Sequence, residues 1–129
     1  MIDQARGSWC RVLESQKFRE ALDQVVSLAR HGNRIFDGAQ PWKSRKTDPD
    51  RCGADLAALL ELVHAVSVLL LPFLPNSAGK LTAAFRSAAP VASESVTRIG
   101  TEMLLAPGSE LVSPGILYPR LELSEEESE

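Results

Sequence analysis

The segment from Asp48 to Pro75 constrains the fold of this sequence more than any other. It opens with Asp48-Pro49-Asp50, in which an aspartate suits the helix cap, a proline suits the first helical position and a second acidic residue complements the helix dipole. Apolar positions follow at helical spacing: Leu56, Leu59, Leu60, Val63, Val66, Leu69 and Leu70. Pro72 and Pro75 end the helix. Its second half is apolar nearly all round, which predicts the central helix of a bundle.

Two further helices are predicted beside this segment. Before it, one apolar stripe recurs at steps of three and four residues, formed by Phe18, Leu22, Val25, Ala29, Gly32 and Phe36. Gly38 is expected to end that helix, and 39–42 to form a loop, because the residue before a proline is pushed out of the helical region. After the central segment, Pro75 opens a helix with Ala78, Leu81, Thr82 and Phe85 on one side.

The two ends of the chain carry weaker patterns. Residues 2–15 suit a short helix that Gly7 interrupts, and residues 93–99 suit one or two turns. Residues 104–121 hold prolines and glycines between short apolar pairs, so they are expected to run extended over the bundle. The sequence therefore predicts an all-α antiparallel helical bundle over residues 1–122 with an extended C-terminal segment. The acidic tail, 123–129, is expected to be disordered.

The net charge of −3 combines two opposite regions. Residues 122–129 carry five glutamates and no base, and the chain without them carries +2. Residues 30–46 hold five cations against Asp37 alone, a net charge of +4. A local basic patch permits a polyanionic partner even on an acidic protein, although an ordinary solvated face has the same composition.

Sequence signatures of enzymatic chemistry do not occur in these 129 residues. There is no G-x-x-x-x-G-K-[ST], no G-x-G-x-x-G and no H-E-x-x-H. Cys10 and Cys52 match no zinc or redox spacing, and His31 and His64 are isolated. The length suits one domain and leaves no room for a second. We expect no catalytic site, no metal and no cofactor on this chain.

The sequence also predicts no contact with a membrane. The most apolar run, Ala65–Pro75, has 11 residues, whereas a membrane span needs about 20. Met1 and Ile2 are followed at once by Asp3, without the basic and apolar regions of a signal peptide. These features favour a cytoplasmic protein.

Trp42 is the residue that most needs a functional explanation. It follows Pro41 in a predicted loop and precedes Lys43, Arg45 and Lys46. An exposed indole among cations suits unpaired nucleic acid, because bases stack on the ring while the cations neutralise phosphates. The alternative is that Trp42 packs under the loop and caps the bundle.

Three segments of the sequence resemble the C-terminal anticodon-binding domain of methionyl-tRNA synthetase. They are FREALDQVVSLARHGNRIFDGAQPWKSRKTDP, LLELVHAVSVLLLPFLPNSAGKL and ILYPRLE, in the family's order and spacing. The matching residues are Asn33, Ile35, Asp37, Pro41, Trp42, Lys46, Asp48, Pro49, Leu71, Pro72, Phe73, Pro75, Ala78, Lys80 and 117–121. The resemblance implies a helical bundle that reads the CAU anticodon of methionine tRNA.

The resemblance also implies roles for individual residues. Trp42 matches the family tryptophan that stacks on the first anticodon base, a cytosine. Asn33 and Asp37 match positions on the preceding helix and are expected to orient the turn, and Lys46 matches the family lysine. From charge alone, the candidates for contacts with the RNA backbone are Arg30, Arg34, Lys43, Arg45 and Lys46.

Departures from the family keep two functions open. The catalytic signatures H-I-G-H and K-M-S-K-S are missing here, Ser44 replaces a leucine and Tyr118 replaces a phenylalanine. The first hypothesis is a tRNA anticodon-binding domain without a catalytic domain on this chain; if it is part of a larger enzyme, that enzyme is a methionine–tRNA ligase. The second is a protein-interaction or regulatory module that docks on a separate catalytic chain through residues 104–122.

Overall fold

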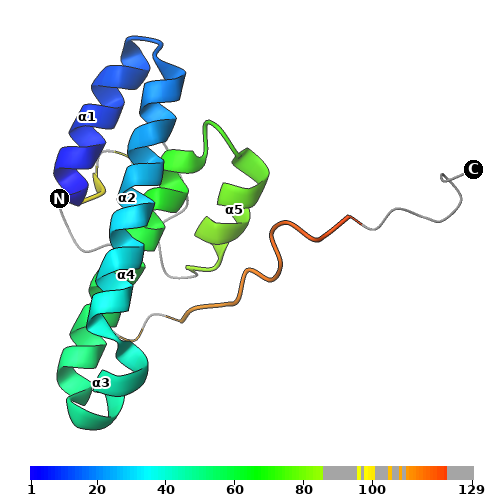
Figure 1. Cartoon of the computed structure of the whole chain (residues 1–129). Coiled ribbons are helices and arrows are strands. Elements are labelled where there is room, and N and C mark those ends of the chain that lie inside the picture. Colours follow the sequence, from blue (N-terminus) through cyan, green and yellow to red (C-terminus); the bar gives the residue numbers. More distant parts are fainter. Residues whose placement is uncertain (86–95, 97, 101–104, 106–107, 109, 122–129) are drawn as a thin grey trace, which may run out of the picture.

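The computed structural model describes residues 1–85, 96, 98–100, 105, 108 and 110–121 of the chain (Figure 1). Within these residues the fold is an all-α bundle, as predicted. Its helices are α1 (Ile2–Glu14), α2 (Phe18–Ala39), α3 (Pro41–Thr47), α4 (Pro49–Leu70) and α5 (Pro75–Ala83). Figure 1 shows α1, α2, α4 and α5 alternating in direction, with α3 at the far end of the α2–α4 pair.

The start signals read from the sequence are confirmed. Asp48 caps α4, and its Oδ1 accepts a hydrogen bond of 3.1 Å from the backbone N–H of Arg51. Pro49 and Pro75 take first-turn positions of α4 and α5, where a missing N–H costs nothing. The central helix ends at Leu70, just before Pro72.

The core lies where α1, α2 and α4 meet, and the stripe predicted for α2 is only partly right: Val25 and Gly32 of that stripe are buried, but its aromatic ends are not. The buried residues of α2 are Ala21, Val25, Leu28 and Gly32. Phe18 and Phe36 of the predicted stripe are 60% and 42% exposed. Both sets repeat at steps of three and four, so spacing alone could not separate them. At Gly32 only a residue without a side chain fits, because α4 approaches closely there: a Cβ on Gly32 would lie 2.7 Å from Leu62 Cδ2.

Three predicted features of the N-terminal half were wrong. Helix α1 continues through Gly7 and carries Trp9, which is buried in the core. Helix α2 continues through Gly38 and ends at Ala39. Gln40 then takes a left-handed conformation, with φ of 45° and ψ of 59°, and Pro41 begins α3. The rule that the residue before proline leaves the right-handed helical region holds, but a single such residue replaces the predicted loop.

The C-terminal segment is extended, as predicted, but it leaves the bundle instead of covering it. Leu111 forms an isolated antiparallel bridge with Phe85, and the N–H of Val112 donates to the carbonyl of Ala84 at 2.9 Å. Beyond this point Figure 1 shows the chain running away from the helices. Most of the turn predicted at 93–99 and the whole tail 123–129 lie outside the described residues.

Helix α4 is longer than its most apolar run. In the part of the chain that the structure describes, it is the one helix whose length and composition would suit a membrane span. The 11-residue run considered in the sequence therefore understated its apolar length. The same composition is typical of the central helix of a soluble bundle, and Leu62, Ala65 and Val68 of α4 are buried in this core.

Candidate nucleic-acid interface

Trp42 lies on helix α3, not in a loop. Pro41 is buried at the start of α3, and its carbonyl oxygen accepts a hydrogen bond of 3.6 Å from the thiol of Cys52 on α4. The carbonyl of Gln40 accepts hydrogen bonds from the N–H groups of Lys43 and Ser44, at 2.8 and 3.0 Å. These hydrogen bonds satisfy two N–H groups of α3 and hold its first turn against α4. The backbone that carries Trp42 is therefore fixed in position.

One flank of the Trp42 indole packs against Phe36, and the rest of the ring is open. The two ring centroids lie 5.6 Å apart, with the ring planes tilted by 58°. Trp42 is 49% exposed, whereas Trp9, the other tryptophan, is 4% exposed. Phe36 belongs to the last turn of α2, so the left-handed turn at Gln40 brings the two rings together. The two rings together form an aromatic surface, and about half of each residue is exposed to solvent.

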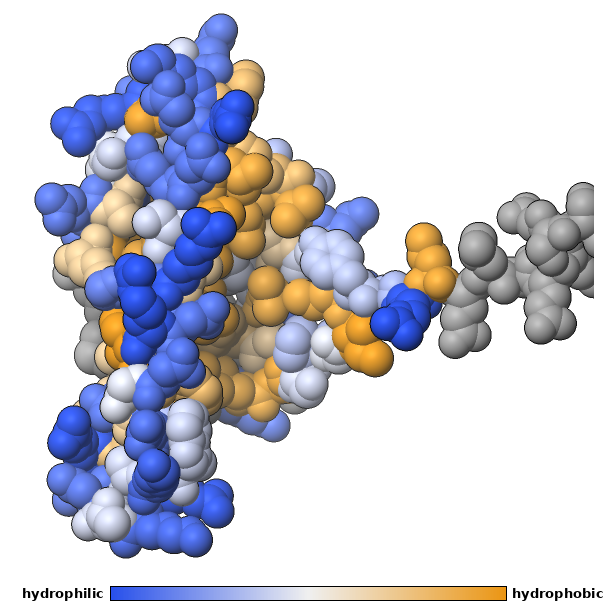
Figure 2. Space-filling model, viewed as in Figure 1, coloured by the Kyte–Doolittle hydropathy of each residue, from blue (hydrophilic) through white to orange (hydrophobic). Residues whose placement is uncertain are grey.

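The three cations of α3 are all exposed. Helical spacing places Lys43 and Lys46 on the outward side with Trp42, and Trp42 and Lys46 are neighbours at i and i+4. Arg45 lies between this outward side and the buried side of Pro41. Among the residues with a described position, no carboxylate forms an ion pair with any of the three. Figure 2 shows this end of the molecule as hydrophilic, with the apolar surface gathered nearer the middle.

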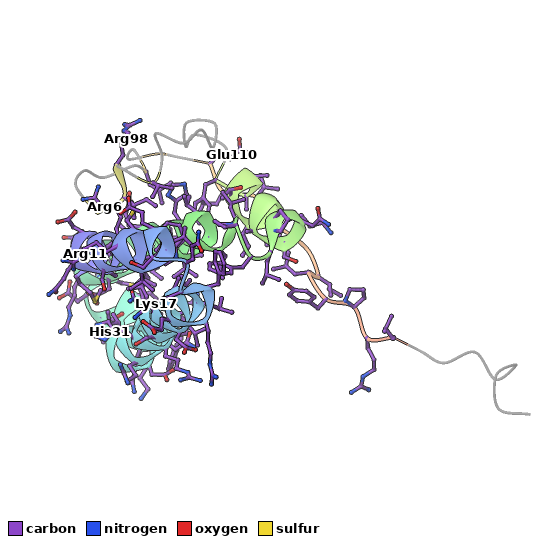
Figure 3. The ribbon with its side chains drawn as sticks, turned by 90° about the horizontal axis from the view of Figure 1, so that it is seen from above. Arg6, Arg11, Lys17, His31, Arg98 and Glu110 are labelled. Carbon is purple, nitrogen blue, oxygen red and sulfur yellow. The ribbon has the colours of Figure 1, made fainter. Side chains whose placement is uncertain are left out.

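The four predicted site residues of α2 are exposed, but they do not share one face. Asn33 lines an apolar groove of about 210 Å³ between α2, α4 and α5, together with Phe36. Arg34 lines a different cavity, between α1 and α2, which also includes Arg11 and His31. Figure 3, seen from above, places Arg11 and His31 on the flank away from the C-terminal segment. Asn33 therefore lies on the Phe36–Trp42 side, whereas Arg34 points toward α1.

Arg30 and Asp37 occupy the outward face of α2 between these two flanks. They are seven residues apart, two helical turns, and both are exposed. Arg30 precedes Arg34 by one turn, and Asp37 follows Asn33 by one turn. The negative charge nearest to α3 on this helix is thus the carboxylate of Asp37, beside an otherwise cationic surface.

Phe36 is the functional candidate that the sequence analysis missed. Its place in a stripe of apolar residues predicted a core position, yet it is 42% exposed and its ring contacts that of Trp42. A possible signal was the short spacing between the two aromatic residues across Gln40-Pro41. A proline after a non-helical residue turns the chain sharply, so the side chains before and after it can meet.

Among the residues that the structure describes, the titratable groups away from this end form no arrangement suited to acid–base chemistry. His64 of α4 is 3% exposed and lies edge-on to Phe85, with ring centroids 5.2 Å apart. Burial lowers the pKa of His64, and the charge of Glu61 opposes this change. Cys10 and Cys52 are free thiols. No three His, Cys, Asp or Glu side chains gather as a metal site within the described ranges.

Comparisons with known proteins agree on one family. The family model for the anticodon binding domain of methionyl tRNA ligase matches residues 3–129. The methionine–tRNA ligase of Methanopyrus kandleri is 40% identical over 84 residues, which are 63% of this chain and 13% of that protein. The Rickettsia bellii enzyme is 31% identical over 111 residues, 86% of this chain and 21% of the relative. That of Flavobacterium psychrophilum is 34% identical over 110 residues, 85% of this chain and 16% of the relative. The chain spans about a fifth or less of the length of these relatives.

Proposed function

The chain belongs to the family of methionyl-tRNA ligase anticodon-binding domains, and on this premise we propose that it binds methionine tRNA through the CAU anticodon. The observation that carries the proposal is the Trp42 indole, half exposed on α3 and backed by Phe36. A base that stacks on the open part of the indole meets a surface that is already in place. Stacking of a base on an aromatic side chain contributes about 1–3 kcal/mol.

In this proposal the cations around Trp42 hold the RNA backbone. Lys43, Arg45 and Lys46 are exposed on the same short helix as the indole, so phosphates that flank a stacked base come within their reach. Each phosphate that a cation neutralises releases counterions, and binding therefore weakens steeply as salt rises. The first anticodon base, the cytosine, is assigned to Trp42.

The residues of α2 take secondary roles. Asn33 offers an amide beside the Phe36–Trp42 pair, and Asp37 offers a carboxylate on the same helix one turn later. The amide can donate and accept hydrogen bonds, and the carboxylate can accept them, so both can orient the loop bases. Arg30 and Arg34 extend the cationic surface along α2 and are assigned to phosphates. No cofactor or metal is needed for this binding.

The direct test compares methionine tRNA with the same tRNA carrying a changed anticodon. We expect tighter binding of the CAU form, because stacking and hydrogen bonding both depend on the bases presented. Trp42→Ala should weaken binding by about 1–3 kcal/mol. Phe18→Ala removes another exposed aromatic ring, on the first turn of α2, and should leave affinity unchanged. Equal affinity for both tRNAs would refute anticodon reading, and an unaffected Trp42→Ala variant would remove Trp42 from the site.

Fluorescence gives an independent readout of the same contact. The chain has two tryptophans, so a Trp9→Phe variant leaves Trp42 as the only indole. A base stacked on Trp42 should quench its emission and protect it from an added quencher. Emission that does not change when tRNA binds would place the RNA elsewhere on the protein.

A second candidate function is docking on a separate catalytic chain. The exposed apolar side chains of the C-terminal segment favour it: Ile116, Tyr118 and Leu121 are 79%, 66% and 91% exposed. Exposed apolar groups in such density are typical of an interaction surface. The test is sedimentation of this chain with a purified methionine–tRNA ligase body. Co-sedimentation that Leu121→Asp abolishes would support docking, and failure to form a complex would refute it.

Under either function we propose a soluble, cytoplasmic protein.

A further inference from the structure

The apolar groove between α2, α4 and α5 lies next to the root of the C-terminal segment. Its volume is about 210 Å³, and its lining includes Asn33, Phe36, Leu59, Val63, Val66 and Leu81. Leu81 lies on α5 one turn before Phe85, the residue that pairs with Leu111. Figure 2 shows apolar surface gathered on the flank from which the C-terminal segment leaves. The groove and the segment are therefore neighbours.

The groove exposes apolar surface that its own helices do not cover. Phe36 and Val63 are 42% and 41% exposed, although both belong to helices that build the bundle. Each square ångström of apolar surface removed from water contributes about 25 cal/mol. A partner with two or three apolar side chains at alternate positions would gain from entering this groove.

The C-terminal arm, defined here as residues 113–121, has two such side chains at alternate positions, Ile116 and Tyr118, and a third apolar side chain, Leu121, three residues further along. Ile116, Tyr118 and Leu121 are 79%, 66% and 91% exposed, whereas Leu117 between them is half-buried. Nine extended residues span about 30 Å. The arm begins where the N–H of Val112 donates a hydrogen bond to the carbonyl of Ala84, just after α5, and Leu81 of α5 lines the groove, so the arm starts beside the groove.

The charges at the two ends of this interaction are also opposite. Residues 122–129, which follow the arm, carry five glutamates, and residues 30–46 carry a net charge of +4. Phe36 lines the groove and also contacts Trp42, so the groove ends at the cationic helix α3. An arm seated in the groove would bring the glutamates toward Lys43, Arg45 and Lys46.

We propose that the groove is a docking site for this chain's own C-terminal arm, and that the docked arm competes with RNA for the Trp42 surface. The tether is short, so the arm is present at its own groove at an effective concentration in the millimolar range. This favours the arm of the same molecule over that of a second copy. The competition, but not the docking, rests on the proposed RNA-binding function.

Docking can be tested without RNA. Tyr118 is the only tyrosine of the chain, so its ring signals are unambiguous in an NMR spectrum. We expect nuclear Overhauser contacts from this ring to the methyl groups of Val63 and Leu81, independent of protein concentration. Ile116→Ser with Leu121→Ser should remove them, and Ser113→Ala should not. Absence of these contacts in the wild type would overturn the proposal, and contacts that vanish on dilution would assign the arm to a second copy.

Competition is tested by RNA affinity. If nine molecules in ten are closed, the wild type should bind methionine tRNA about tenfold more weakly than the Ile116→Ser, Leu121→Ser variant. Ser113→Ala should match the wild type. If the double variant binds tRNA as tightly as the wild type or more weakly, competition is overturned. Docking is then decided by the NMR contacts alone. A wild type and double variant that both fail to bind tRNA would overturn competition and the proposed function together, but not docking.

Discussion

Protonation of His64 should destabilise this fold, and the structure sets an upper limit on the effect. The imidazole is 3% exposed, lies against the ring of Phe85, and its Nδ1 has no hydrogen-bond partner among the described residues. Burial lowers the pKa of His64 below its ordinary value, and Glu61, which would favour the charged form, only partly opposes this. The folded protein therefore holds a neutral imidazole, while the unfolded chain takes up the proton near pH 6.5.

The direction and size of the effect follow from linkage. Between the two pKa values the unfolded chain binds more protons, so stability is full above about pH 6.5 and is lost as pH falls. A single group can change the free energy of unfolding by at most about 1.4 kcal/mol per pH unit. From pH 7 to pH 5.5 the loss from His64 is at most about 1.3 kcal/mol, or about 5 °C in Tm for a domain of this size.

Urea unfolding at pH 7 and pH 5.5 measures this loss. The informative quantity is the difference between the wild type and His64→Leu, because carboxylates that titrate in the same range contribute equally to both proteins. We expect the wild type to lose more than His64→Leu between the two pH values, by no more than about 1.3 kcal/mol. His31→Gln, at a half-buried position on α2, serves as the control and should behave as the wild type. Equal losses in the wild type and His64→Leu would refute the reasoning.

Two further predictions concern the central pair of helices. Asp48→Ala removes the side chain that accepts the N–H of Arg51 and should lower the free energy of unfolding by about 1 kcal/mol in urea titration; an unchanged midpoint would mean that the cap contributes nothing. Gly53→Ala, at a helix position with open space around it, should stabilise by about 0.5–1 kcal/mol, whereas Gly32→Ala should lose that gain because its new methyl meets Leu62. Thermal unfolding of both variants gives the comparison, and equal shifts would contradict the close approach of α2 and α4.

The sequence predicted helices well where local chemistry decides them. The Asp48-Pro49 start of α4 and the Pro75 start of α5 were both read correctly, because caps and prolines act within a few residues. The buried face of α2 was predicted only in part: Val25 and Gly32 are buried but Phe36 is not, since how far α2 is covered depends on how closely α4 approaches. That distance is a property of the assembled bundle and is not encoded in spacing.

In the candidate site, too, the features set by local chemistry were predicted and those set by the assembled bundle were not. The sequence identified Trp42 and its cations but placed them in a loop, because nothing local indicates that Gln40 adopts a left-handed conformation and restarts a helix. Phe36 was assigned to the core for its place in a periodic pattern. Similarly, the proline-rich segment was read as extended, but the two backbone contacts that hold Leu111 and Val112 at the end of α5 join residues far apart in the sequence, and no local pattern predicts them.

The long pair α2 and α4 has a mechanical consequence. Each has 22 residues and is therefore about 33 Å long, and α3 closes the pair at one tip. Figure 1 shows the N-terminus and the C-terminal arm away from this tip. Trp42 thus sits at one end of the pair, and the length of the pair fixes the offset of Trp42 from the N-terminus and the arm. Removing one turn from both helices would retract the indole by about 5.4 Å, so the length of the pair sets how far the indole stands from the core of the bundle.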